Sequence, residues 1–140
     1  MIDRRNELER VTTSLPRVLH PRRKRIVVVN DRDDSLLLLK TLLQPAYDVD
    51  AFLFGSEALA AISANPPDLV ITDWARPEEI DGRELVERLQ RMKPELPVLL
   101  ISGYVDILGH PAGVAACLSL PYSPQRLSRV VRELIGGPTR

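Results

Sequence analysis

This sequence has few of the features that mark secreted, disulfide-bonded or membrane proteins. Its single cysteine, Cys117, excludes an internal disulfide and a cysteine-based zinc site within one chain. No apolar run approaches the roughly 20 residues that a transmembrane helix needs. The arginine-rich N-terminus has no apolar signal core. We therefore expect a cytoplasmic protein without membrane contact, and its 140 residues are enough for one domain with a real core.

The charges balance overall but are unevenly distributed. The 19 Lys/Arg and 19 Asp/Glu residues give a net charge of zero. Residues 1–25 carry 8 basic and 3 acidic residues, about +5, which leaves 11 and 16, about −5, for the remainder. A neutral chain gives no general case for direct nucleic-acid binding. The basic run Arg22-Arg23-Lys24-Arg25 could contact phosphates, but we interpret it as a solvated lead-in to the first strand.

From residue 26 onward, strand and helix patterns alternate about five times. Short apolar runs, typical of strands that are buried on both faces, predict strands at 26–29, 49–52, 68–72, 98–101 and 115–118. Helical spacing predicts helices at 34–43, from the N-cap Ser56 to 64, from 81 or 82 to 92, and from the N-cap Ser123 to the glycine pair 136–137. Between Gly103 and Gly113 the sequence allows only one or two helical turns. The pattern predicts an α/β fold: a doubly wound, five-stranded parallel sheet of (βα)5 type with a shortened fourth helix.

The ends of the chain do not share this pattern. Pro16 and Pro21 interrupt residues 1–25, which we interpret as a basic extension or linker. We expect one domain over residues 26–137 and a short tail over 138–140.

Polar side chains follow three of the predicted strands. Asn30 and Asp31 follow the first strand, Asp73 follows the third, and Ser102 follows the fourth. Open α/β sheets bind their ligands at the carboxyl ends of the strands. The sequence therefore predicts one polar pocket with two carboxylates and a hydroxyl.

These residues, in this order, resemble the receiver domain of two-component response regulators. The matching segments are Asn30-Asp31, Asp73-Trp74-Ala75-Arg76-Pro77 with Asp81-Gly82, Ser102-Gly103-Tyr104 and Leu120-Pro121-Tyr122. The Ser-Gly-Tyr form and the irregular fourth helix look most like receivers attached to hybrid sensor kinases. The resemblance implies a flavodoxin-like fold and a signalling module, not an enzyme beyond self-catalysed phosphoryl transfer and hydrolysis.

The resemblance also implies a site and partners. Asp73 would accept a phosphoryl group from a histidine kinase or a phosphotransfer protein. Asp31, Asp73 and the backbone carbonyl of Ala75 would hold Mg²⁺, with Asn30 contributing through a water. Ser102 would be the switch hydroxyl, and the peptide bond before Pro121 would be cis. Output would pass through contacts with a downstream protein, a homodimer being one option, and we expect that the chain is not a transcription factor on its own.

Three positions depart from the family pattern. Asn30 replaces one acid of the pair, Leu120 replaces a lysine, and Cys117 stands near the position of an aromatic residue that is coupled to the switch. Arg32 or Arg76 could replace the lost lysine charge. These departures keep a second hypothesis open, a degenerate pseudo-receiver that binds proteins without phosphorylation. A third, a phosphatase with an aspartate nucleophile, fits the strand-end residues less well.

Overall fold

A five-stranded, fully parallel sheet forms the centre of the molecule. The computed structural model describes residues 23–73, 82–103 and 111–137. The strands lie in the order β2-β1-β3-β4-β5. Their bounds are Arg25–Val29 for β1, Asp48–Phe52 for β2, Leu69–Thr72 for β3, Val98–Ser102 for β4 and Ala116–Ser119 for β5. This order is the doubly wound, flavodoxin-like arrangement, which confirms the predicted fold class.

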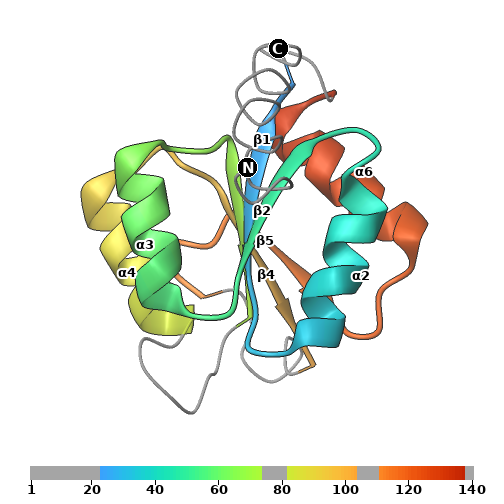
Figure 1. Cartoon of the computed structure of the whole chain (residues 1–140), viewed down its shortest axis with the longest axis horizontal. Helices are drawn as coiled ribbons and strands as arrows, with labels where there is room; N and C mark the ends of the chain where they lie inside the picture. The colour runs from blue at the N-terminus through green and yellow to red at the C-terminus, as the bar shows by residue number, and fades with distance from the viewer. Residues whose placement is uncertain (1–22, 74–81, 104–110, 138–140) are drawn as a thin grey trace, which may run out of the picture.

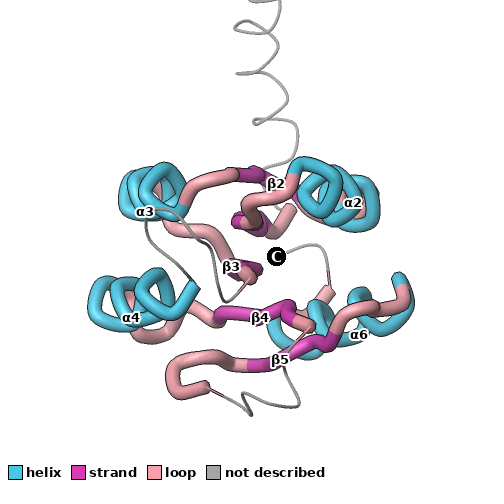
Figure 2. The backbone as a smooth tube through the Cα atoms, turned by 90° about the horizontal axis from the view of Figure 1, so that it is seen from below, coloured by secondary structure: helices cyan, strands magenta, loops and turns pink. Residues whose placement is uncertain are grey.

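Helices cover both faces of the sheet. Helices α2 (Asp33–Leu43) and α6 (Pro124–Ile135) lie on one face, and α3 (Gly55–Ala64) and α4 (Gly82–Met92) lie on the other (Figures 1 and 2). Residues 104–110, where the shortened fourth helix was expected, lie outside the described residues. In the part of the chain that the structure describes, no helix has the length and apolar character that crossing a bilayer requires.

The strands supply side chains to two separate cores, one on each face. Along β1, Ile26 and Val28 pack in the core under α2 and α6, whereas Val27 and Val29 pack in the core under α3 and α4. All four side chains are buried. A parallel strand that is covered on both faces must be apolar at every position, and this requirement explains the unbroken run at 26–29.

The helix ends were predicted with mixed success. Ser123 caps α6 as expected, because its side chain accepts a hydrogen bond from the Arg126 N–H at 3.1 Å. Gly136 follows the last turn with φ of +79°, a conformation that suits glycine. The prediction that Ser56 caps its helix was wrong. Helix α3 already begins at Gly55 with Phe54 as N-cap, so Ser56 lies in the first turn.

For residues 23–25, the interpretation of the basic run as a solvated lead-in was also wrong, and Arg22 lies outside the described residues. Arg23, Lys24 and Arg25 are each only partly exposed. Each side chain donates a hydrogen bond to a main-chain carbonyl elsewhere in the domain. Arg25 also begins β1, one residue earlier than predicted. The described basic residues of this run are therefore part of the folded domain.

Candidate functional site

The predicted polar residues lie along one edge of the sheet. Val29 of β1 pairs with Thr72 of β3, so the next residues along the two strands, Asn30 and Asp73, lie at the same level. Neighbouring strands are about 4.8 Å apart. Thr72 in turn pairs with Leu100, which places Ser102 one residue beyond the level of Asp73. All strands point to this edge, and Figure 2, seen from below, looks toward it.

Asn30 shapes the turn between β1 and α2. Its backbone N–H donates to the carbonyl of Phe52 at 3.1 Å, which extends the pairing of β1 with β2 by one bond. Its side-chain oxygen accepts from the N–H of Arg32 at 3.0 Å. Asp31, between them, is exposed to solvent. The turn therefore places Asp31 at the site edge while the Asn30 amide holds the backbone in place.

Arg32 is engaged with its own helix start. Its guanidinium lies 3.2 Å from the Asp34 carboxylate, and both side chains are largely exposed. The hydrogen bond and charge of Asp34 raise the pKa of Arg32, with a smaller contribution from Asp31, and the same pair lowers the pKa of Asp34. Helix α2 begins at Asp33, one residue before the predicted start at 34, and the negative charge of Asp33 and Asp34 in its first turn suits the helix dipole. This pairing does not support Arg32 as a substitute for the missing lysine, and Arg76 lies outside the described residues.

Asp73 is half-buried and directly follows the central strand β3. The preceding residue, Thr72, is 1% exposed and is a polar member of an otherwise apolar strand. Its hydroxyl donates to the Asp73 carbonyl at 2.9 Å. Sequence reasoning gave Thr72 no role. The available signal was its place as the last residue of a buried run, directly before the candidate nucleophile.

Ser102 connects the site to β5. It is 6% exposed and pairs in register with Ser119. Its carbonyl accepts from the N–H of Leu120 at 3.1 Å. The peptide bond between Leu120 and Pro121 is cis, as expected. The Leu120 side chain is 52% exposed, so this position presents an apolar surface where the family pattern has an ammonium group.

Cys117 lies in β5, where it pairs in register with Leu100. It is half-buried, less than expected for a core residue, and it packs against the core under α3 and α4. Burial raises the pKa of its thiol, which keeps it protonated at neutral pH.

The donor set at the strand ends fits Mg²⁺ but is small. Magnesium prefers oxygen ligands and typically uses one or two carboxylates together with waters and substrate phosphate oxygens. Asp31 and Asp73 can supply the two carboxylates. Among the residues that the structure describes, no group of three or more His, Cys, Asp or Glu side chains is arranged for a metal. Trp74 and the predicted ligand Ala75 lie outside the described residues.

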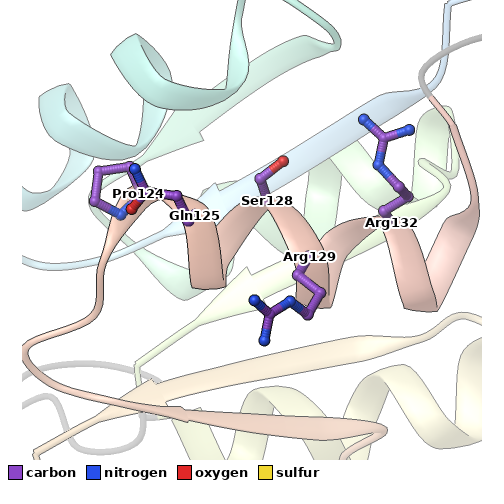
Figure 3. A pocket seen from close by; sticks show the side chains of 5 residues that line it. All are labelled: Pro124, Gln125, Ser128, Arg129 and Arg132. Carbon is purple, nitrogen blue, oxygen red and sulfur yellow. The ribbon is translucent and has the colours of Figure 1, made fainter.

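A surface hollow elsewhere is a weaker candidate for chemistry. It runs along α6 and is lined by Pro124, Gln125, Ser128, Arg129 and Arg132. Figure 3 shows the guanidinium groups of Arg129 and Arg132 projecting in different directions. They do not converge on one point, and the lining has no carboxylate or thiol. The strand-end residues therefore remain the candidate site.

The fold and the strand-end residues define a receiver-type signalling module. The family model of the response regulator receiver domain matches residues 26–132, well over half of the chain. This chain therefore belongs to the response regulator receiver domain family of two-component systems. Members of this family are signalling modules that generally depend on Mg²⁺ and interact with histidine kinases or phosphotransfer proteins. The match favours the receiver hypotheses over the phosphatase hypothesis.

Relatives differ in how much of their length the chain covers. The response regulator receiver protein CpdR of Brucella abortus is 29% identical over 117 residues, which cover 80% of this chain and 97% of CpdR. The alkaline phosphatase synthesis transcriptional regulatory protein PhoP of Bacillus subtilis is 29% identical over 117 residues, with 80% of this chain covered. The chain spans only 48% of PhoP and 24% of the C4-dicarboxylate transport transcriptional regulatory protein DctD of Rhizobium meliloti.

Solved receiver structures share the fold. A response regulator receiver domain protein from Clostridium thermocellum is 26% identical with a TM-score of 0.72, over 80% of this chain and 94% of that one. The BeF3-activated receiver domain of DrrB is 25% identical with a TM-score of 0.71, over 80% and 97% of the two chains.

Proposed function

We propose that this chain is a Mg²⁺-dependent receiver that accepts a phosphoryl group on Asp73 from the phosphohistidine of a histidine kinase or phosphotransfer protein. The observation that carries the proposal is the position of Asp73. It follows the central strand at the ligand-binding edge, level with Asn30 at the end of β1 and one residue short of the level of Ser102 on β4. A strand-end carboxylate between a second acid and a hydroxyl is suited to receive a phosphoryl group.

The transfer needs one nucleophile and neutralisation of negative charge. A carboxylate oxygen of Asp73 attacks phosphorus, and the bond from phosphorus to the histidine nitrogen breaks. A bound Mg²⁺ would offset the repulsion between the carboxylate and the phosphoryl oxygens. Asp31 and Asp73 would hold the ion, with the Ala75 carbonyl as a further ligand and Asn30 acting through a water.

Thr72 and Ser102 have separate tasks in this proposal. The Thr72 hydroxyl bonds the Asp73 carbonyl and thereby restrains the backbone that carries the nucleophile. The hydroxyl of Ser102 would bond a phosphoryl oxygen after transfer. Because the Ser102 carbonyl accepts a hydrogen bond from the Leu120 N–H, movement at Ser102 would displace the start of the segment that leads into α6.

Exposed leucines near the site support a protein as the phosphoryl donor. Leu37 is 66% exposed and Leu38 48% exposed, and both lie near the middle of α2, which starts two residues after Asp31. Leu120 adds a third exposed apolar side chain at the same edge. Large exposed apolar groups beside a site are typical of protein-binding surfaces.

The test is phosphorylation of the purified chain by acetyl phosphate with and without Mg²⁺. Intact-mass measurement should show one added phosphoryl group with Mg²⁺ and none with EDTA. The Asp73→Asn variant should not be modified. The matched control Asp48→Asn, which removes a carboxylate at the opposite edge of the sheet, should react like the parent. Beryllofluoride with Mg²⁺ should change the fluorescence of Trp74, the single tryptophan, in the parent but not in Asp73→Asn.

The second candidate function is the pseudo-receiver. It is favoured by the exposed Leu120 and by the amide of Asn30, which together remove two charges from the family's site. A folded protein that neither accepts phosphoryl groups nor responds to beryllofluoride would overturn our proposal. That result would support a binding module that works without phosphorylation.

A further inference from the structure

The segment that enters β1 reaches the C-terminal ends of helices on both faces of the sheet. The guanidinium group of Arg23 donates to the carbonyl of Gln44, the C-cap of α2, at 2.5 Å and to the carbonyl of Tyr47, directly before β2, at 3.0 Å. The ammonium group of Lys24 donates to the carbonyl of Ile135, the last residue of α6. Lys24 and Ile135 are 111 residues apart in sequence. The start and the end of the domain are therefore joined by one side chain.

Arg25 contacts the C-terminal end of α3 in a similar way. Its guanidinium donates to the carbonyl of Asn65, the C-cap of α3, at 2.5 Å. It also forms an ion pair with Asp50 of β2 at 2.8 Å. Its backbone N–H donates to the Asp68 carboxylate at 2.8 Å, just before β3. We call Arg23, Lys24 and Arg25 the cationic clasp.

These contacts meet a physical need of each helix. The last four carbonyls of a helix have no partner within the helix, and they form the negative end of its dipole. A cation that donates to such a carbonyl provides the missing hydrogen bond and also interacts favourably with the negative end of the dipole. Helix α3 has no basic residue in its own last turn, so Arg25 supplies the cation from another element.

The clasp lies outside the region that the receiver family model matches. That match covers residues 26–132, whereas Lys24 precedes it and Ile135 follows it. We propose that the clasp is a conformational joint between the segment that enters the domain and the end of α6. Displacing the entering segment withdraws the Lys24 ammonium group from α6. Loosening the end of α6, in turn, releases the entering segment, because coupling between two sites is reciprocal at equilibrium.

A second contact makes this reciprocity testable. The Tyr47 hydroxyl donates to the carbonyl of Gly136 at 3.3 Å. The end of α6 is thus held from two places, the clasp and the segment between α2 and β2. Removing the hydroxyl loosens α6 without touching the clasp, since Arg23 contacts the backbone carbonyl of Tyr47 and not its side chain.

Hydrogen–deuterium exchange on the full chain tests the forward direction. Lys24→Met keeps the aliphatic stem and removes the donor and the charge. It should speed exchange at residues 132–137 roughly two- to fivefold, the range that a cation at a helix end contributes, and leave the end of α3 unchanged. Arg25→Met should give the opposite pattern. Lys24→Arg should preserve the parent rates, and Arg129→Met, an exposed arginine on α6, should change neither end.

The reverse direction uses Tyr47→Phe. This variant should speed exchange at residues 23–26 as well as at 132–137, by similar factors. Acceleration confined to 132–137 would overturn the joint, and so would a uniform increase over all peptides in Lys24→Met. If Lys24→Met does not fold, the Tyr47→Phe measurement still decides the question.

Discussion

Replacing Asn30 by aspartate should lower the stability of the metal-free protein and raise its affinity for Mg²⁺. The substitution is nearly isosteric, and a carboxylate can accept the Arg32 N–H that the amide now accepts at 3.0 Å. The backbone bond to Phe52 is unaffected. The change is therefore one negative charge, placed at the same level as Asp73 on the neighbouring strand.

The magnitude follows from this placement. Groups on adjacent strands are about 5 Å apart. Two unit charges at that distance repel by about 0.8 kcal/mol in water and about 3 kcal/mol at an effective dielectric of 20. Asp73 is half-buried, so we expect Asn30→Asp to be about 1–2 kcal/mol less stable without metal. Attraction to a divalent cation reverses the sign, and an interaction through water should tighten Mg²⁺ binding about tenfold.

The assay is urea unfolding of both proteins at constant ionic strength, in EDTA and in saturating Mg²⁺. Asn30→Asp should be the less stable protein in EDTA and should gain more from Mg²⁺ than the parent. Gln44→Glu adds the same charge at the opposite edge of the sheet, so its stability difference from the parent should not depend on Mg²⁺. An Asn30→Asp difference that is equal in both solutions would refute the proposed metal position.

Four further changes test other parts of the structure. Arg25→Met removes the 2.8 Å ion pair with Asp50 and should lower the free energy of unfolding by about 1.5–3 kcal/mol, the range for a hydrogen bond to a charged group, measured by urea titration. Leu120→Lys returns a cation to the site edge and should speed phosphorylation by acetyl phosphate about fivefold, whereas Leu120→Met should not. Ser123→Ala removes the α6 cap and should cost about 1 kcal/mol, seen in thermal unfolding. Burial raises the pKa of Tyr122, so above about pH 10 the folded state keeps the phenol proton more readily than the unfolded state does. The free energy of unfolding should therefore fall as the pH rises past about 10, and Tyr122→Phe should make this fall smaller.

The fold could be predicted because its signals are local and repeated. Unbroken apolar runs mark strands covered on both faces, and their alternation with helical spacing leaves few topologies. The strand-end residues were found for the same reason, since parallel strands bring their carboxyl ends to one edge. Helix starts were less reliable. A serine at 56 was a plausible cap, yet α3 begins one residue before it at Gly55.

The contacts of the basic run could not be read from the sequence. Each side chain contacts a main-chain carbonyl that is 21 to 111 residues away. Every residue has such a carbonyl, so the sequence does not indicate which one is contacted. A cluster of arginine and lysine looks the same whether it is solvated or caps helices. The hydrogen bond between Asn30 and Arg32 is a similar case. From the sequence, Asn30 was interpreted only as lacking the negative charge of an acid, and not as a side chain that could stabilise the turn.

The contact between Lys24 and the last residue of α6 has a practical consequence for engineering. Because the chain enters and leaves the domain side by side, the two ends can be bridged by a short linker and new termini opened in a surface turn, as in circular permutation. The contact also means that the domain can be spliced into a loop of a host protein with little distortion of either. In both designs the attachment point lies at the amino edge of the sheet, so Asp73 at the carboxyl edge stays accessible.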